Sequence, residues 1–145
     1  DGVLPAPAEY TDADSEMLSQ ATAVLEAYRT HLDNQAFHEA LESIWLVVRA
    51  ANAYVDQQAP WALHKEDPAR RDTVLFVLAE TIRHLALYIQ PFMPDSASVM
   101  LDQLSVPADA RDFTHVGQGS ALAPGTNLPK PAPVFPRFVE EEPTD

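Results

Sequence analysis

The strongest constraint on the fold of this chain is the recurrence of apolar residues at intervals of three and four positions. The longest run begins near Asn34 and ends at about Gln58. Its apolar line consists of Phe37, Leu41, Ile44, Val48, Ala51 and Val55. Because an α-helix completes a turn in about 3.6 residues, this spacing places these side chains on one face. The run therefore predicts an amphipathic helix over 34–58 that packs this face against other helices.

One segment before this region and one well after it carry the same spacing. The first covers about residues 12 to 33, and Thr11 or Asp12 can cap its N-terminus. The other follows the break at Pro91-Phe92-Met93-Pro94 and extends over about residues 95 to 104. We expect one helix in each segment.

Residues 69 to 90 are patterned as a third helix, which has the broadest apolar surface. Its stripe consists of Leu75, Leu78, Ile82, Leu85 and Ile89, and it is widened by Phe76, Val77 and Leu87. A short linker is expected at Pro60, because proline disfavours helical geometry in the residue before it. The predicted fold class is all-α: an antiparallel bundle of about four helices, in which the helix over 69–90 is central and most buried.

The composition changes at Ser105, where an extended tail is predicted to begin. Glycines 117, 119 and 125 and prolines 124, 129, 131, 133 and 136 oppose regular helix in this region. The tail also contains Leu128, Val134, Phe135 and Phe138, which are too apolar for a free linker. We therefore expect one domain over 1–145, with a helical bundle over 1–104 and a tail over 105–145 that packs on it.

Composition excludes several classes of protein. The 145 residues contain no run of about 20 apolar residues that would span a bilayer. They contain no cysteine, which excludes disulfides, thiolate zinc sites and cysteine nucleophiles, and which fits a cytoplasmic protein. The 22 Asp and Glu residues outnumber the 9 Lys and Arg residues, so the overall field repels phosphate. Any role in nucleic-acid binding must overcome this repulsion locally.

Catalytic and metal-binding patterns are absent from the sequence. The five histidines are scattered, and no two have the i, i+4 spacing of a helical metal site. There is no glycine-rich phosphate loop and no Gly-x-Ser-x-Gly motif. We predict no catalytic residue, no metal site and no cofactor within this chain, and a binding module rather than an enzyme.

The most specific pattern lies where the second predicted helix ends. It reads Asn52-Ala53-Tyr54 and then Pro60-Trp61-Ala62-Leu63, followed by Lys65. This string resembles the Asn-x-Tyr and Pro-Trp-x-Leu-x-Lys signature of the anticodon-binding domain of methionyl-tRNA synthetases. Two later segments agree with that family in order and distance: Arg83 followed by Pro91-Phe92-Met93-Pro94, and Gly125 followed by Lys130-Pro131-x-Pro133-x-Phe135-Pro136-Arg137. The resemblance covers about residues 34 to 139, and it implies the helical anticodon-binding fold of class I synthetases.

The resemblance implies that Trp61 contacts the anticodon. An indole face can stack on an unstacked loop base, which is worth about 1 to 3 kcal/mol. The alternative is that Trp61 fills the end of the bundle. Asn52 and Tyr54 belong to the same signature. We expect Tyr54 to flank the core, and Asn52 either to hydrogen-bond a neighbouring helix or loop or to contact the tRNA.

Positive charge near Trp61 is concentrated in Lys65, Arg70 and Arg71. These three are candidates for phosphate contacts, and the alternative is that the arginines are ordinary surface charges near a helix start. A local basic strip can bind a nucleic-acid backbone on a net-acidic protein, because the Debye length is only about 8 Å.

The sequence departs from the family in one important respect. The family's domain normally begins with a further helix that carries an Asn-x-x-x-Arg motif, which this sequence lacks. The synthetase catalytic motifs His-Ile-Gly-His and Lys-Met-Ser-Lys-Ser are absent too, as are the zinc-binding cysteines of the catalytic half. We therefore expect a C-terminal piece of a longer enzyme, which cannot itself aminoacylate tRNA.

The resemblance also implies partners and cofactors. The implied partners are the anticodon stem-loop of methionine tRNA, with its CAU anticodon, and the catalytic half of the parent enzyme. That parent joins methionine to tRNA with ATP and Mg²⁺, and Zn²⁺ is a further candidate cofactor of its catalytic half. No membrane partner is implied, and we expect a monomer because the chain has no coiled-coil heptads.

Trp45 lies on the polar face of the second predicted helix and needs a partner. We expect it to pack beneath a loop or another helix, with RNA stacking as the alternative. A further hypothesis places Trp45 and Arg49 against the absent helix or the catalytic half. Two rival functions stay open: an acidic helical protein-interaction module, and the anticodon domain of a synthetase for isoleucine, valine, leucine or cysteine.

Overall fold

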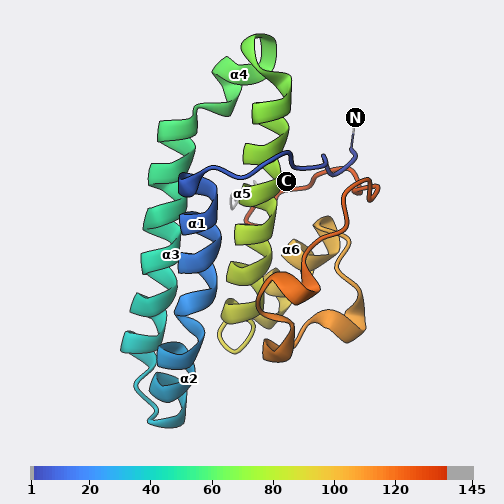
Figure 1. The fold of residues 1–145 in the computed structure, drawn as a ribbon. Coiled ribbons are helices and arrows are strands. Elements are labelled where there is room, and N and C mark those ends of the chain that lie inside the picture. The colour runs from blue at the N-terminus through green and yellow to red at the C-terminus, as the bar shows by residue number, and fades with distance from the viewer. Residues whose placement is uncertain (1, 137–145) are drawn as a thin grey trace, which may run out of the picture.

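The computed structural model describes residues 2–136, which form a bundle of α-helices (Figure 1). In chain order these are α1 (Asp12–Ala23), α2 (Leu25–Asp33), α3 (Phe37–Gln58), α4 (Pro60–Glu66), α5 (Pro68–Ile89) and α6 (Pro94–Gln103). Three 3-10 turns follow: η1 (Ala108–Ala110), η2 (Phe113–His115) and η3 (Gln118–Ser120). Helices α1, α3 and α5 contact one another and alternate in direction, while α6 packs on α5. The predicted all-α antiparallel bundle is confirmed.

Two of the predicted helical boundaries are wrong. The first segment is divided at Val24 into α1 and α2, where the hydroxyl of Thr22 donates to the carbonyl of Ser19 over 3.0 Å. Such a side-chain bond competes with the helical ladder. The linker expected at Pro60 is instead the short helix α4, because proline is favourable in the first turn of a helix.

Helix α5 is central and most buried, as predicted, but its buried face is not the predicted stripe. Leu75 and Ile82 retain 41% and 42% of their accessible surface. The three residues that were predicted to widen the stripe, Phe76, Val77 and Leu87, are buried. The other buried positions are Val74, Ala86 and Tyr88, together with the polar residues Thr73, Glu80, Thr81, Arg83 and His84. Because α1, α3, α4, α6 and the tail all pack around α5, positions with polar side chains are also enclosed.

The described part of the tail contacts the bundle through both apolar and polar groups. Val106 and Leu122 are buried in one cluster with Leu4 from the N-terminal segment. The two terminal segments also pair with each other, because the amide of Leu4 donates to the carbonyl of Thr126 over 2.9 Å. Leu128 and Val134 are partly buried, whereas Phe135 is exposed, and Phe138 lies outside the described residues.

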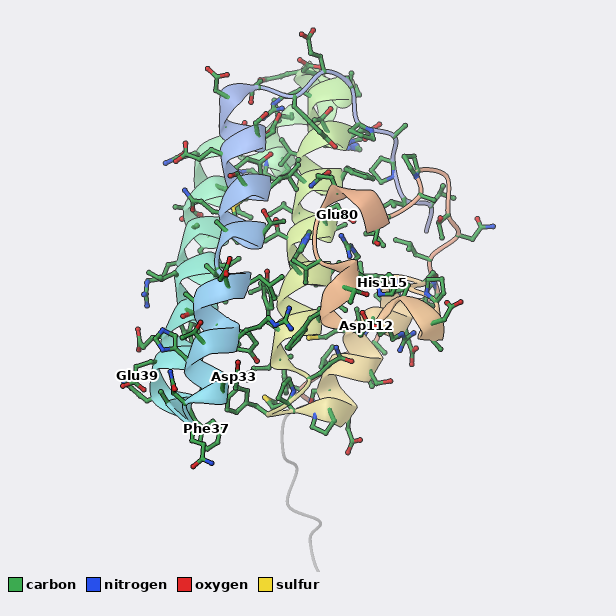
Figure 2. The ribbon with its side chains drawn as sticks, turned by 60° about the horizontal axis from the view of Figure 1, so that its bottom comes forward. Asp33, Phe37, Glu39, Glu80, Asp112 and His115 are labelled. Atoms are coloured by element: carbon green, nitrogen blue, oxygen red, sulfur yellow. The ribbon has the colours of Figure 1, made fainter. Side chains whose placement is uncertain are left out.

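A buried polar cluster of α5 residues fixes the tail to the bundle. Arg83 forms two 2.9 Å hydrogen bonds with the carboxylate of Glu80, and it also donates to the carbonyls of His115 and Gly117. Glu80 in turn accepts from the amide of Leu122 over 2.6 Å. Figure 2 shows Glu80 beside the tail, with Asp112 and His115 on the adjacent turns. The tail is therefore held by specific polar bonds as well as by apolar packing.

His84 belongs to the same buried cluster. Its Nδ1 lies 2.7 Å from the carbonyl of Glu80, and its Nε2 lies 3.0 Å from the amide of Gly117. This arrangement assigns a neutral ring with the proton on Nδ1. Burial, reinforced by the charge of Arg83, lowers the pKa of His84, which agrees with a neutral ring.

Trp45 is not covered, contrary to the expectation that it packs beneath a loop or helix. It retains 52% of its accessible surface and lines an apolar groove of about 250 Å³ together with Leu41, Val48, Met93 and Phe135. Within residues 2–136, no helix combines the length and apolarity needed to cross a membrane.

Candidate nucleic-acid interface

Helix α4 forms the end of the bundle opposite α2, between the end of α3 and the start of α5 (Figure 1). Ala59 ends α3 in the left-handed conformation, with φ 43° and ψ 59°. Pro60 then starts α4, and Asp67 caps α5 by accepting from the amide of Arg70 over 3.0 Å. These local signals turn the chain twice within a few residues. The result is a short helix that presents its own side chains at the tip of the molecule.

Trp61 is the most prominent side chain of this tip. It retains 65% of its accessible surface, so it does not fill the end of the bundle. Lys65 follows four residues later and is also exposed. Residues four apart share one face of a helix, so the indole and the ammonium group are neighbours on α4. This face can stack on a flat aromatic ligand and attract an anion at the same time.

Arg71 joins α4 to α5 while remaining partly accessible. Its guanidinium lies 2.7 Å from Nδ1 of His64, and it also forms an ion pair with Asp72 at 2.6 Å. The side chain of Arg71 keeps 25% of its accessible surface. Each nitrogen of this guanidinium has a partner, because Nε and Nη2 donate to Asp72 and Nη1 lies beside His64, but both partners are themselves at least partly exposed.

Arg70 is placed differently, because its guanidinium points toward the interior of the tip. It binds both carboxylate oxygens of Asp14, at 2.5 and 2.8 Å, and it donates to the side-chain carbonyl of Gln58 at 2.5 Å. The structure therefore separates Arg70 from the exposed group formed by Trp61, Lys65 and Arg71.

Asp14 is the acceptor at the centre of this arrangement. It is fully buried and accepts from four donors: two from Arg70, the hydroxyl of Tyr54 at 2.5 Å, and the amide of Thr11 at 2.8 Å. Burial alone would raise the pKa of Asp14, but the hydrogen bonds from Arg70, Tyr54 and Thr11 outweigh it and lower the pKa to about 2. The carboxylate is therefore ionised at neutral pH.

The two other residues of the α3 signature differ in burial. Tyr54 is buried, as expected, and burial followed by its bond to Asp14 raises its pKa, so its hydroxyl stays protonated and donating. Asn52 is exposed on α3. It lies six residues before the end of α3 at Gln58, which corresponds to roughly 9 Å along the helix axis. Its amide is available to a ligand that extends from the tip along α3.

Within residues 2–136, no three His, Cys, Asp or Glu side chains are grouped as metal ligands would be. Glu66 and Asp67 adjoin Lys65, so the local charge is nearly balanced despite the chain's net charge of −13. The cluster of Trp61, Lys65 and Arg71 is thus a local exception to an acidic surface.

Sequence reasoning did not identify Asp14 and Gln58 as parts of this tip. Asp14 occupies the third position after the cap Thr11, where an acidic residue is ordinarily explained by capping alone. Its distance of 56 residues from Arg70 in the sequence leaves no periodic signal that connects the two.

Comparison with known proteins identifies this architecture. A family model described as the anticodon binding domain of methionyl tRNA ligase matches residues 4–145. The chain is 51% identical to the methionine–tRNA ligase of Brucella suis over 98% of its own length, and 52% identical to that of Mesorhizobium japonicum over 97%. It covers 27% of each of those two proteins.

Solved structures give the same result. The chain is similar to the apo form of Mycobacterium tuberculosis methionyl-tRNA synthetase, with a TM-score of 0.90 and 46% identity, covering 97% of this chain and 29% of that one. It is also similar to that synthetase in complex with methionyl-adenylate, with a TM-score of 0.90 and 48% identity, covering 94% of this chain and 27% of that one. The chain thus spans roughly a quarter of the length of its relatives, and it belongs to the family of anticodon-binding domains of methionyl-tRNA ligases.

Proposed function

We propose that this chain binds the anticodon stem-loop of methionine tRNA, with its CAU anticodon, through the α4 tip. The single observation that carries the proposal is the exposure of Trp61, which retains 65% of its surface beside Lys65. Single-stranded RNA loops are recognised by stacking their bases on aromatic side chains, and Trp61 offers an accessible indole on the same short helix as a lysine.

Four residues at or near the tip have a role in this proposal. Trp61 stacks on an anticodon base, while Lys65 and Arg71 contact backbone phosphates. Asn52 hydrogen-bonds a base edge, because its amide offers both donors and an acceptor. Arg70 was a candidate phosphate contact from sequence, but its guanidinium is bound to the fully buried Asp14, whereas Arg71 is bound to Asp72, which is partly exposed and can be exchanged for a phosphate. The phosphate role is therefore assigned to Lys65 and Arg71.

The proposal extends to a longer parent enzyme. That enzyme joins methionine to tRNA in the cytoplasm with ATP and Mg²⁺, and Zn²⁺ is a further candidate in its catalytic half. The catalytic half is then a second partner of this chain, and the chain itself holds no cofactor. The similarity to a synthetase solved in complex with methionyl-adenylate supports this chemistry, since that adenylate contains both methionine and a nucleotide. We propose a monomeric assembly.

The test uses two variants that each keep one tryptophan, because Trp45 and Trp61 are the two tryptophans of the chain. Trp45→Phe retains the proposed stacking residue, and Trp61→Phe is the matched control. Each is titrated at low salt with a methionine anticodon stem-loop and with a loop of changed anticodon. The CAU loop should quench the fluorescence of the variant that retains Trp61 and leave that of Trp45 unchanged. Equal quenching of both, or none, would contradict the proposal.

A further inference from the structure

Arg70 connects the two chain segments that border α4. Its side chain donates to Gln58, the last residue of α3, and its backbone amide donates to Asp67, the residue directly after α4. The segment 59–67, which carries Trp61, is therefore closed at its base by one residue. Leu63 also packs on the core and His64 lies beside Arg71, whereas every α4 residue except Pro60 and Leu63 is exposed.

Asp14 anchors this closure to the body of the bundle. It lies in the first turn of α1 and binds Tyr54 of α3 and Arg70 of α5. The pair is enclosed: the Asp14 side chain has no accessible surface, and that of Arg70 keeps 17%. A bidentate bond between a carboxylate and a guanidinium fixes orientation as well as distance. Three helices are thus held in one geometry at the base of α4.

The backbone at the start of α4 requires such a restraint. Ala59 adopts a left-handed conformation at φ 43°, which is unfavourable for a residue with a Cβ atom. A conformation of this kind persists when the surrounding contacts determine it, and Gln58, the residue directly before Ala59, is bonded to Arg70.

We propose that Asp14 and Arg70 form a clasp that positions α4, so that Arg70 acts on RNA binding through Trp61 and not by contacting phosphate. The effect of the clasp on RNA rests on the proposed function, whereas its effect on α4 does not. Asp14 thereby becomes a positioning residue for anticodon binding, although it is buried and negatively charged and cannot approach RNA itself.

The clasp and a direct phosphate contact predict opposite behaviour for two variants. Arg70→Lys keeps the positive charge but loses the bidentate geometry and cannot bond Asp14 and Gln58 at once. Asp14→Asn removes a negative charge, so simple electrostatics would improve RNA binding. If Arg70 contacts phosphate, Arg70→Lys is mild and Asp14→Asn is neutral or favourable. If the clasp operates, both variants weaken binding, and their effects are not additive because they break the same interaction.

The experiment has one arm without RNA and one with it, both in the Trp45→Phe background. In the first arm, acrylamide quenching and anisotropy of Trp61 and hydrogen exchange of the amides of 60–67 are compared with the unmodified background. Asp14→Asn and Arg70→Lys should raise Trp61 mobility and exchange at α4. The control is Asp102→Asn on α6, which breaks the ion pair of Asp102 with Arg111 of the tail and should change neither readout. Unchanged Trp61 mobility in both clasp variants would overturn the proposal.

In the second arm, affinity for the methionine anticodon stem-loop is measured over a range of salt concentrations. The clasp variants should bind about tenfold more weakly, which is the scale of losing one stacked base. In both clasp variants the slope of log affinity against log salt concentration should match that of the background. In Lys65→Gln this slope should fall by the contribution of about one phosphate contact. Arg70→Gln, which removes the charge, should also keep the slope of the background, and a slope reduced as in Lys65→Gln would overturn the clasp in favour of a phosphate contact.

Two further outcomes separate the clasp from the proposed function. If the unmodified background binds no stem-loop, the proposed function fails, and the arm without RNA still decides whether the clasp positions α4. If Asp14→Asn is too unstable to study, Gln58→Ala removes only the bond at the base of α4. It should then reproduce the increased Trp61 mobility, and unchanged mobility in Gln58→Ala would refute the clasp.

Discussion

Replacing Arg83 by methionine tests how the tail is held on the bundle. Arg83 is 1% exposed and donates to three partners: the carboxylate of Glu80 and the carbonyls of His115 and Gly117. Methionine has a similar length and is apolar, so the substitution removes the charge and the donors with little loss of volume. The carboxylate of Glu80 would then be a buried charge that retains only the amide of Leu122 as a partner.

The size of the effect follows from burial. Removing one partner of a buried ion pair costs about 3 to 5 kcal/mol, because the other charge stays behind uncompensated. The two carbonyls also lose their donors, although they can regain water if the tail lifts away. We therefore expect a loss of about 3 to 5 kcal/mol in the free energy of unfolding, accompanied by release of the tail.

The assay combines urea unfolding with hydrogen exchange of the tail amides. Arg49→Met is the matched control, because Arg49 lies 3.8 Å from Glu42 with 59% of its side-chain surface exposed. Exposed pairs of this kind contribute about 0 to 1 kcal/mol. Arg83→Met should lose far more stability than Arg49→Met, and the amides of Gly117 and Leu122 should exchange faster. A loss below about 1 kcal/mol, or unchanged exchange of these amides, would refute the reasoning.

Three further changes have defined outcomes. The pKa of Asp14 is lowered to about 2 from an ordinary value of about 3.9. The ionised carboxylate therefore contributes roughly 2 to 3 kcal/mol to the free energy of unfolding above about pH 4, and this contribution is lost as the pH falls towards 2. Urea midpoints between pH 7 and pH 2 should fall less steeply in Asp14→Asn than in wild type, and parallel curves would contradict this. Ala59→Gly should stabilise the protein by roughly 0.5 kcal/mol, because relief of the strain at φ 43° exceeds the extra entropy that glycine loses on folding. A lower melting temperature would count against this prediction. Tyr28→Phe should cost about 1 kcal/mol, because it removes a buried hydroxyl that donates to the carbonyl of Tyr88, and thermal unfolding would detect the change.

Apolar spacing predicted the helical segments of this chain but not the direction in which each helix is buried. The stripe through Leu75 and Ile82 was assigned to the core, yet both residues are partly exposed. The buried face of α5 contains Glu80 and Arg83, which pair with each other and also bind tail residues more than 30 positions later. A local pattern cannot reveal that a charged residue is buried when the groups that satisfy it come from a distant segment.

The sequence predicted some parts of the candidate site, and only the fold shows the others. The Pro-Trp-x-Leu-x-Lys string located the tip, and the family likeness singled out Trp61. Its exposure depends on α4, a helix of seven residues that is too short to have a periodic signal of its own. Arg70 and Arg71 are adjacent in sequence and looked equivalent as phosphate contacts. Only the fold distinguishes them, because it brings Asp14 to Arg70 and leaves part of Arg71 exposed.

The most direct test of the account is to map the RNA-binding surface by NMR, using the indole N–H signals of Trp61 and Trp45 as markers. A methionine anticodon stem-loop is added to the labelled protein, followed in a separate sample by a loop of changed anticodon. If the α4 tip binds the anticodon, the first loop should shift the NMR signals of the Trp61 indole and of the amides of 58–71 and leave the Trp45 indole signal unaffected. The changed loop should produce weaker shifts. Shifts confined to the groove around Trp45, or no shifts with either loop, would contradict the claim that the α4 tip binds the anticodon.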